Sequence, residues 1–153
     1  MGVELRRVRV LVADDEQAVL ESYQRILNGG PTKSSARPGA PLHGASSSLI
    51  NEASALLDSS VNLELVCCRQ AEEAVAAVRD SVAAADPFAV AFIDVRMPPG
   101  PERVWAAERI RMCDPHVHIV MVTAYADYDP EDISHRIPPS ERLLYIQKPC
   151  YNV

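Results

Sequence analysis

The sequence predicts an α/β fold built on a five-stranded parallel sheet. Five short apolar runs alternate with segments whose apolar residues recur at helical spacing. Alternating strands and helices imply parallel strands joined by right-handed crossovers. Each apolar run also ends in a polar residue. The 153 residues are enough for one domain with a substantial core.

The first predicted strand is residues 8–13, an apolar run that stops at Asp14 and Asp15. A helix is expected over 16–27, because its apolar residues share one face and a Gly-Gly pair stops it. That face carries Val19, Leu20, Tyr23, Ile26 and Leu27. The helix dipole favours acids near a helix start, so a purely structural explanation of Asp14 and Asp15 stays open.

The next elements follow a segment of different composition. Residues 29–48 are rich in Gly, Pro and Ser, which predicts a loop rather than a packed structure. Helical spacing returns over 49–57, so we expect residues 29–60 to be an insertion that contains a short additional helix. A second strand is predicted at 63–68 and an Ala-rich helix at 71–85. The expected buried face of that helix carries Ala71, Ala74, Val75, Val78 and Val82.

The central stretch is the apolar run 90–93, which leads directly into Asp94 and then into Pro98 and Pro99. A run bounded by breakers fits a buried strand. Asp94 would then lie at the carboxyl end of that strand, where open α/β sheets bind their ligands. An acid that merely ends a strand is the alternative. A helix is expected over 101–112. Its inward-facing residues are Val104, Ala107 and Ile110.

Two further strands complete the series. The fourth strand, 118–122, ends at Thr123. The fifth strand, 143–147, ends at Lys148, and a short helix is expected between the two strands at 131–137.

Composition argues against several classes of function. The net charge of −6 disfavours a nucleic-acid surface. No apolar run approaches the ~20 residues of a membrane span, and the N-terminus lacks a signal-peptide core. We therefore expect a cytoplasmic protein that contacts no membrane. The four cysteines include no C-x-x-C pair, which argues against a zinc site or a disulfide framework and favours reduced thiols.

The strand ends bring a set of polar side chains to one edge of the predicted sheet: Asp14, Asp15, Asp94, Thr123 and Lys148. Three clustered carboxylates repel one another unless a cation neutralises them. A hard divalent ion held by carboxylates, a carbonyl and waters is the pattern of Mg²⁺, and the set offers no soft ligand. The predicted cofactor is therefore Mg²⁺.

A magnesium ion beside a lysine and a hydroxyl is an arrangement that handles a phosphoryl group. Asp94, on the middle strand, is the candidate nucleophile, and Asp15 is the principal ion ligand. Lys148 would pair with one phosphoryl oxygen, and Thr123 would donate a hydrogen bond to another. Ala124 is small enough to leave the approach open.

Four segments of the chain resemble the receiver domain of two-component response regulators. They are VRVLVADDE, FIDVRMPPG, IVMVTAYAD and YIQKP, in this order and at comparable spacing across nearly the whole chain. The resemblance implies a flavodoxin-like, doubly wound sheet with strand order 2-1-3-4-5. It also implies that Asp94 receives a phosphoryl group from the phosphohistidine of a histidine kinase or a phosphotransfer protein.

The resemblance further implies roles for individual residues. The implied metal ligands are Asp14, Asp15, Asp94 and the backbone carbonyl of Arg96. Asp14 would act mostly through a water. Tyr145 occupies the position of the family's switch aromatic, which swings into space vacated when Thr123 moves toward the phosphoryl group. A core aromatic on the last strand is the alternative for Tyr145.

The chain departs from the family pattern in several places. Glu102 and Arg103 stand where the family often has Asp-Gly, so the loop after Asp94 is expected to take another path. Arg96 and Tyr125 are bulky residues on the approach of hydrolytic water, which predicts slow loss of the phosphoryl group.

The end of the chain is a further departure. Only five residues follow Lys148, so the family's fifth helix is absent and we expect a piece cut from a longer protein. A bare sheet face that invites a homodimer, or cover by residues 49–57, is the alternative.

Three functions of different classes are compatible with these residues. The leading interpretation is a receiver domain over residues 1–153 that switches an output domain or a partner and is not a stand-alone enzyme. A pseudo-receiver that only binds a partner is the alternative, although the intact set of five polar residues argues against it. An Mg²⁺-dependent hydrolase would need a second acid where Arg96 stands. The PPG and VTAYAD variants resemble receivers fused to hybrid kinases or cyclic-dinucleotide turnover proteins.

Overall fold

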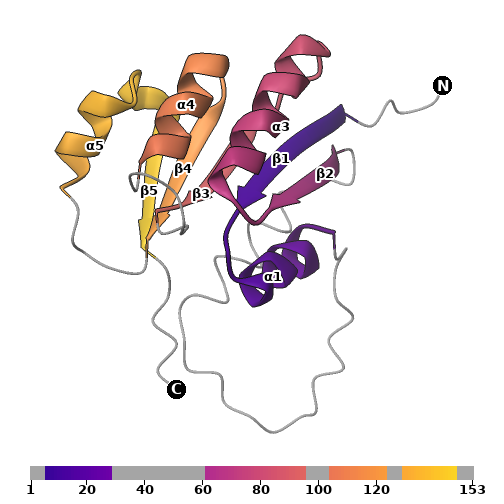
Figure 1. Ribbon diagram of the computed structural model, residues 1–153. Coiled ribbons are helices and arrows are strands. Elements are labelled where there is room, and N and C mark those ends of the chain that lie inside the picture. The colour runs from indigo at the N-terminus through magenta and orange to yellow at the C-terminus, as the bar shows by residue number, and fades with distance from the viewer. Residues whose placement is uncertain (1–5, 29–60, 96–103, 124–128, 148–153) are drawn as a thin grey trace, which may run out of the picture.

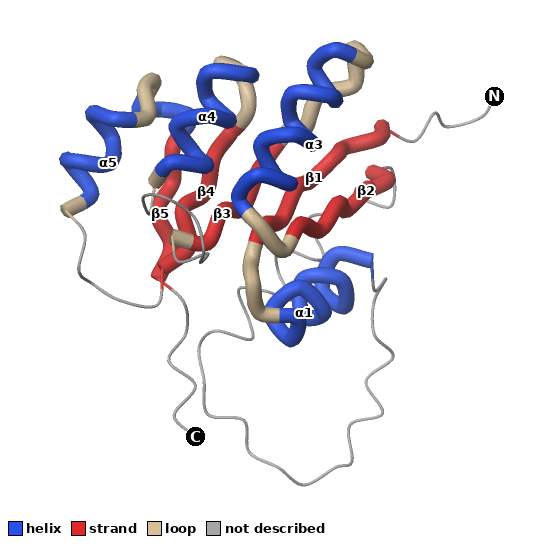
Figure 2. The backbone as a smooth tube through the Cα atoms, viewed as in Figure 1, coloured by secondary structure: helices blue, strands red, loops and turns tan. Residues whose placement is uncertain are grey.

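The computed structural model describes residues 6–28, 61–95, 104–123 and 129–147, which form a five-stranded sheet with helices on both faces (Figures 1 and 2). The strands are β1 (Arg6–Ala13), β2 (Val61–Cys68), β3 (Val90–Asp94), β4 (His118–Thr123) and β5 (Leu143–Gln147). All neighbouring strands pair in parallel, in the order β2-β1-β3-β4-β5. The predicted flavodoxin-like strand order is confirmed.

The helices lie on opposite sides of the sheet, as a doubly wound fold requires. The described helices are α1 (Gln17–Asn28), α3 (Ala71–Ala83), α4 (Trp105–Cys113) and α5 (Pro130–Arg136), with a short 3₁₀ turn, η1 (Ser140–Arg142), before β5. α1 covers one face, and α3, α4 and α5 lie on the other (Figure 1). The predicted insertion at 29–60 and the expected end of the fold after Lys148 lie outside the described residues.

The larger core lies between the sheet and helices α3 to α5. Because side chains alternate across a strand, every second residue of the central strands faces this layer. Its fully buried members include Leu11, Ile93, Ile119, Met121, Ala74, Val78, Ala107 and Ile110. The small alanines of α3 and α4 leave room for the large aliphatic side chains of the strands, which is how a helix packs closely on a sheet.

The smaller core lies between the sheet and α1. Val10 and Val12 of β1 are buried there with Leu20 of α1. The Tyr23 and Phe92 rings also meet at this interface, with centroids 5.3 Å apart. These contacts confirm the predicted inner face of the first helix for Leu20 and Tyr23.

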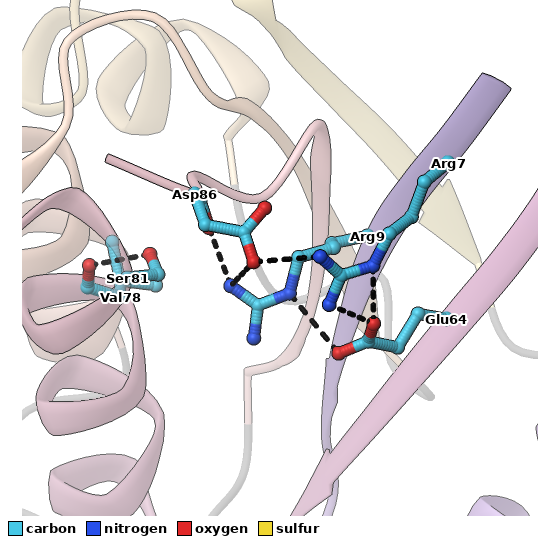
Figure 3. Close-up of polar contacts among 6 residues, drawn as sticks. All are labelled: Arg7, Arg9, Glu64, Val78, Ser81 and Asp86. Carbon is cyan, nitrogen blue, oxygen red and sulfur yellow. Dashed lines mark hydrogen bonds and ion pairs between the residues drawn. The ribbon is translucent and has the colours of Figure 1, made fainter. Parts of the chain in front are cut away.

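One predicted buried position, Val82, is wrong, and the apolar face predicted for the first helix is not buried along its whole length. Ile26 is 56% exposed, because it lies at the margin of the α1 stripe that contacts the sheet. Val82 is 41% exposed, because the buried stripe of α3 continues through Ser81 instead. The Ser81 hydroxyl donates a 2.7 Å hydrogen bond to the Val78 carbonyl, which satisfies it inside the core (Figure 3).

A network of charged side chains closes the amino end of β1 and β2 (Figure 3). Arg7 Nε donates to Glu64 at 2.6 Å, and Arg7 Nη1 donates to Asp86 at 3.0 Å. Arg9 Nε donates to the same glutamate at 3.2 Å, and its guanidinium lies 4.3 Å from the centre of the Phe88 ring. The hydrogen bond from Arg7 holds the pKa of Glu64 below its ordinary value.

A buried arginine ties the loops at the same end of the sheet. The Arg111 guanidinium donates to the carbonyls of Val117 at 2.6 Å, Pro115 at 3.2 Å and Arg142 at 2.9 Å. These contacts join the end of α4 to the start of β4 and to the turn before β5. Burial lowers the pKa of Arg111, and the carbonyl acceptors compensate the lost hydration of the cation.

The sheet has β2 at one edge and β5 at the other. On β5, Leu144 is 61% exposed and Ile146 is 45% exposed. Tyr145, between them, faces the larger core.

Candidate metal and phosphoacceptor site

Three aspartates meet at the carboxyl edge of the sheet. β1 and β3 are neighbours with Ala13 opposite Ile93, so the residues that follow, Asp14 and Asp94, emerge side by side. One carboxylate oxygen from each of Asp14, Asp15 and Asp94 lies within 4.8 Å of the others. Asp14 and Asp94 are only 2% and 5% exposed. The structure therefore brings together the three acids that the sequence predicts at this edge.

Backbone hydrogen bonds fix this edge beyond the ends of the strands. The Asp14 N–H donates to the Cys68 carbonyl at 3.1 Å, which continues the β1–β2 ladder by one residue. The Asp14 carboxylate accepts the Glu16 N–H at 2.9 Å and so shapes the entry to α1. On the other side of Asp94, the Val95 N–H donates to the Val122 carbonyl at 2.9 Å. The strand tips that carry Asp14 and Asp94 are thus held by regular sheet hydrogen bonds.

The predicted hydroxyl lies at the same edge. Asp94 is opposite Val122, so Thr123 is one residue further along β4, and it is 3% exposed. Thr123 pairs in turn with Gln147, the last residue of β5. The predicted residues Arg96, Ala124 and Lys148, together with Tyr125, lie outside the described residues, and their roles stay predictions.

The donor set has the chemistry of a hard cation. Three carboxylates whose oxygens lie within 4.8 Å of one another are stabilised by a divalent ion with oxygen ligands. Cys68, the thiol adjacent to this edge, is not a member of this group of potential ligands, which consists of carboxylates alone. Burial, with smaller contributions from Glu73 and Cys67, raises the pKa of Cys68 to about 11. The residues present therefore fit Mg²⁺ rather than a thiolate-binding ion.

Tyr145 lies two residues before the end of β5 and packs against the larger core. It is half-buried, and its hydroxyl is buried without a hydrogen-bond partner among the described residues. Leaving a buried hydroxyl unsatisfied costs about 1–3 kcal/mol. This inward position is compatible with both hypotheses for Tyr145, a core aromatic and a switch residue.

One residue that contacts this edge, Arg69, was not anticipated from the sequence. Arg69 Nη2 donates to the backbone carbonyl of Asp15 at 3.4 Å, and the Arg69 N–H donates to Glu73 at 3.1 Å. The rule that located the aspartates would also have placed Arg69 near this edge, because it directly follows β2. The contact with Asp15 depends on the path of the loops, which the sequence pattern does not specify.

Comparison with known proteins identifies the fold. The structure is similar to a CheY-like response regulator receiver domain protein from Methanospirillum hungatei JF-1, with a TM-score of 0.60 and 22% identity over 93% of this chain and 82% of the other. It is also similar to the response regulator TrrA from Thermotoga maritima in complex with Mg²⁺ and BeF, with a TM-score of 0.54 and 19% identity over 94% and 89% of the two chains.

A third similar structure is the CheX–CheY–BeF₃–Mg²⁺ complex from Borrelia burgdorferi, with a TM-score of 0.57 and 14% identity over 93% of this chain and 78% of the other. No protein-family model and no curated protein sequence matches the chain. The chain thus has the fold of the CheY-like receiver domains of two-component response regulators, as the sequence motifs predict. Within the part of the chain that the structure describes, no helix is both long and apolar enough to cross a bilayer.

Proposed function

We propose that the protein is a response-regulator receiver domain that accepts a phosphoryl group on Asp94 in an Mg²⁺-dependent reaction. One observation carries the proposal: Asp94 is buried at the carboxyl end of the central strand β3, within 4.8 Å of Asp14 and Asp15. Carboxylates held this close together repel one another, and a bound cation relieves that repulsion. The proposal is also supported by the fold, which is similar to that of response regulator receiver domains.

The chemistry assigned to Asp94 is nucleophilic. A carboxylate oxygen of Asp94 attacks the phosphorus of a phosphohistidine on a histidine kinase or phosphotransfer protein, so a P–O bond forms while the P–N bond breaks and the imidazole leaves. Bound Mg²⁺ would neutralise charge on the phosphoryl oxygens. Asp14, Asp15 and the Arg96 carbonyl complete the proposed ligand set, and the similar TrrA and CheY structures were solved with Mg²⁺ and a beryllium fluoride.

The remaining predicted residues respond to the phosphoryl group. Thr123, buried at the end of β4, is proposed to donate its hydroxyl to a phosphoryl oxygen, and Lys148 to pair with another. Ala124 leaves the approach open. Tyr145 is the proposed switch aromatic, because its inward position leaves a buried hydroxyl without a partner among the described residues, which lowers the free-energy cost of moving the ring out of this position. The switch would act on a fused output domain or a partner protein inside the cytoplasm.

The test is the intact mass of the protein after incubation with a small phosphodonor and Mg²⁺. We expect a gain of one phosphoryl group in the wild type and in Asp80→Asn, whose acid is exposed on α3. Asp94→Asn should gain none, and chelation of Mg²⁺ should prevent the gain in the other two. An unmodified wild type, with its fold verified by circular dichroism, would favour a pseudo-receiver that only binds a partner.

A further inference from the structure

The junction between β2 and α3 reaches across to the acidic edge. Arg69, the first residue after β2, donates from Nη2 to the backbone carbonyl of Asp15, 54 positions away in the sequence, at 3.4 Å. We infer that Arg69 is a positioning residue that holds the β1–α1 loop, and with it Asp15, in the geometry that binds Mg²⁺. The inference rests on the proposed function, which makes Asp15 a metal ligand.

Asp15 needs such support more than the other two acids do. Asp14 and Asp94 are buried at strand tips, and sheet hydrogen bonds hold the backbone beside each of them. Asp15 is half-buried and lies in the short connection between the end of β1 at Ala13 and the start of α1 at Gln17. Its carboxylate is useful to an ion only when the loop holds it near the other two, because a divalent cation requires its ligands together.

Arg69 is itself anchored where it leaves the strand. Its N–H donates at 3.1 Å to the carboxylate of Glu73, in the first turn of α3. The N-cap residue Gln70 makes no side-chain capping bond, so Glu73 fixes this turn from within the helix. The guanidinium therefore extends from a fixed backbone. Two hydrogen bonds connect α3 to the loop of Asp15: one joins Glu73 to the Arg69 N–H, and the other joins the Arg69 guanidinium to the Asp15 carbonyl.

The charge of Arg69 and its hydrogen bond affect metal binding with opposite signs. A guanidinium close to the site repels a divalent cation, so removal of the charge alone would strengthen Mg²⁺ binding. Removal of the hydrogen bond frees the loop and weakens binding. The sign of the change in affinity thus separates a positioning role from a purely electrostatic one.

The experiment is an Mg²⁺ titration of the whole chain, followed by the amide chemical shifts of residues 14–16. Arg69→Met keeps the aliphatic stem but removes the donor, and we expect its Mg²⁺ affinity to fall about threefold to tenfold. This loss reaches only the lower limit of the roughly 10- to 100-fold range for outer-shell residues, because the bond is long and exposed. Arg69→Lys keeps a cationic donor, so its Mg²⁺ affinity should fall less than that of Arg69→Met. The matched control is Arg79→Met, which removes the same charge from an exposed position further along α3, where Arg79 pairs with Asp80.

Equal or tighter Mg²⁺ binding by Arg69→Met would overturn the inference, as would an equal loss in Arg79→Met. Urea unfolding without Mg²⁺ should give the same midpoint for Arg69→Met and wild type, because the residue is exposed. If the wild type itself showed no Mg²⁺-dependent shift, and Asp15→Asn behaved identically, the proposed function would fail together with the inference. A wild type that binds and an Arg69→Met that binds equally would overturn the inference alone.

Discussion

The two ends of the sheet both gather charged residues, but they arrange them in different ways. At the amino end, Arg7 and Arg9 alternate in space with Glu64 and Asp86, so every charge has an opposite neighbour (Figure 3). At the carboxyl end, three carboxylates of one sign lie within 4.8 Å of one another. Opposite charges that pair attract one another, whereas like charges held together repel, and a bound cation relieves that repulsion.

The two ends of the sheet also differ in how deeply their charged side chains are buried. At the amino end, the Arg7, Glu64 and Asp86 side chains are 37–50% exposed, and Arg9 is 16% exposed. Ion pairs between exposed side chains contribute little to stability. Asp14 and Asp94 are almost completely buried, where an acid costs most. The comparison teaches that the sign pattern and depth of a charged cluster, rather than its number of charges, distinguish a candidate functional site from a structural network.

The largest effect on stability is expected from the buried cation at the amino end. Arg111→Met should lower the free energy of unfolding by about 2–4 kcal/mol, because several carbonyls lose a buried donor. Urea unfolding measures it, and Mg²⁺ affinity should not change. Arg109→Met, at the exposed neighbouring arginine on α4, should stay within about 0.5 kcal/mol of wild type. Similar values for the two variants would contradict the structural role of Arg111.

At the carboxyl end, we expect a substitution to lower the Mg²⁺ affinity without lowering the stability of the metal-free protein. Asp15→Asn should lower Mg²⁺ affinity by at least about tenfold, about 1.4 kcal/mol, because a charged ligand is lost. Without Mg²⁺, its free energy of unfolding should equal or exceed that of wild type, because repulsion among the carboxylates falls. The control is Glu16→Gln, an exposed neighbour with the same change in charge. If metal-free Asp15→Asn were less stable than wild type, the carboxylates at the carboxyl end would not be repelling one another as we infer.

Tyr145→Phe should raise the free energy of unfolding by about 1 kcal/mol, because it removes a buried hydroxyl without a partner among the described residues. Thermal unfolding of the unphosphorylated protein is the measurement. Tyr23→Phe on α1, whose ring is also half-buried, reports the general effect of removing a tyrosine hydroxyl. No gain at Tyr145 relative to Tyr23 would argue against a strained inward position.

The smallest effect concerns pH at the amino end. The hydrogen bond from Arg7 lowers the pKa of Glu64 below 4.5, so its contribution to stability is complete above about pH 4.5 and is lost as the pH falls through the lowered pKa. An NMR titration of the Glu64 carboxyl should have a midpoint below 4.5, and Arg7→Met should move that midpoint upward. Added salt should reduce the difference between the two proteins. An unchanged midpoint in Arg7→Met would show that the pair is not formed in solution.

Much of the fold could be predicted because the pattern is local. The five apolar runs end within two residues of the observed strands, since a buried parallel strand is a short apolar run that a polar residue or turn stops. Ser81 could not be predicted in the core, because its hydroxyl is satisfied by the Val78 carbonyl of its own helix, and hydropathy does not register that bond.

The acids of the site could also be predicted, because parallel strands of one sheet end at one edge. That rule places Asp14, Asp15 and Asp94 at one edge, where the structure also has them. The long-range partners could not be predicted: Arg111 depends on a carbonyl at Arg142, and Arg69 on one at Asp15. Such contacts depend on the paths of the loops in three dimensions, and the spacing of apolar residues in the sequence does not predict those paths.

The edge strand β5 has a consequence for handling the protein. Its sequence, LLYIQ, carries no charge and no proline, and Leu144 and Ile146 expose their side chains on the same face. The described residues of this edge therefore carry neither a charge nor a proline, two devices that stop sheets from adding strands of other molecules. We expect self-association to rise steeply with concentration, and Leu144→Lys to extend the concentration at which the protein remains monodisperse in light scattering.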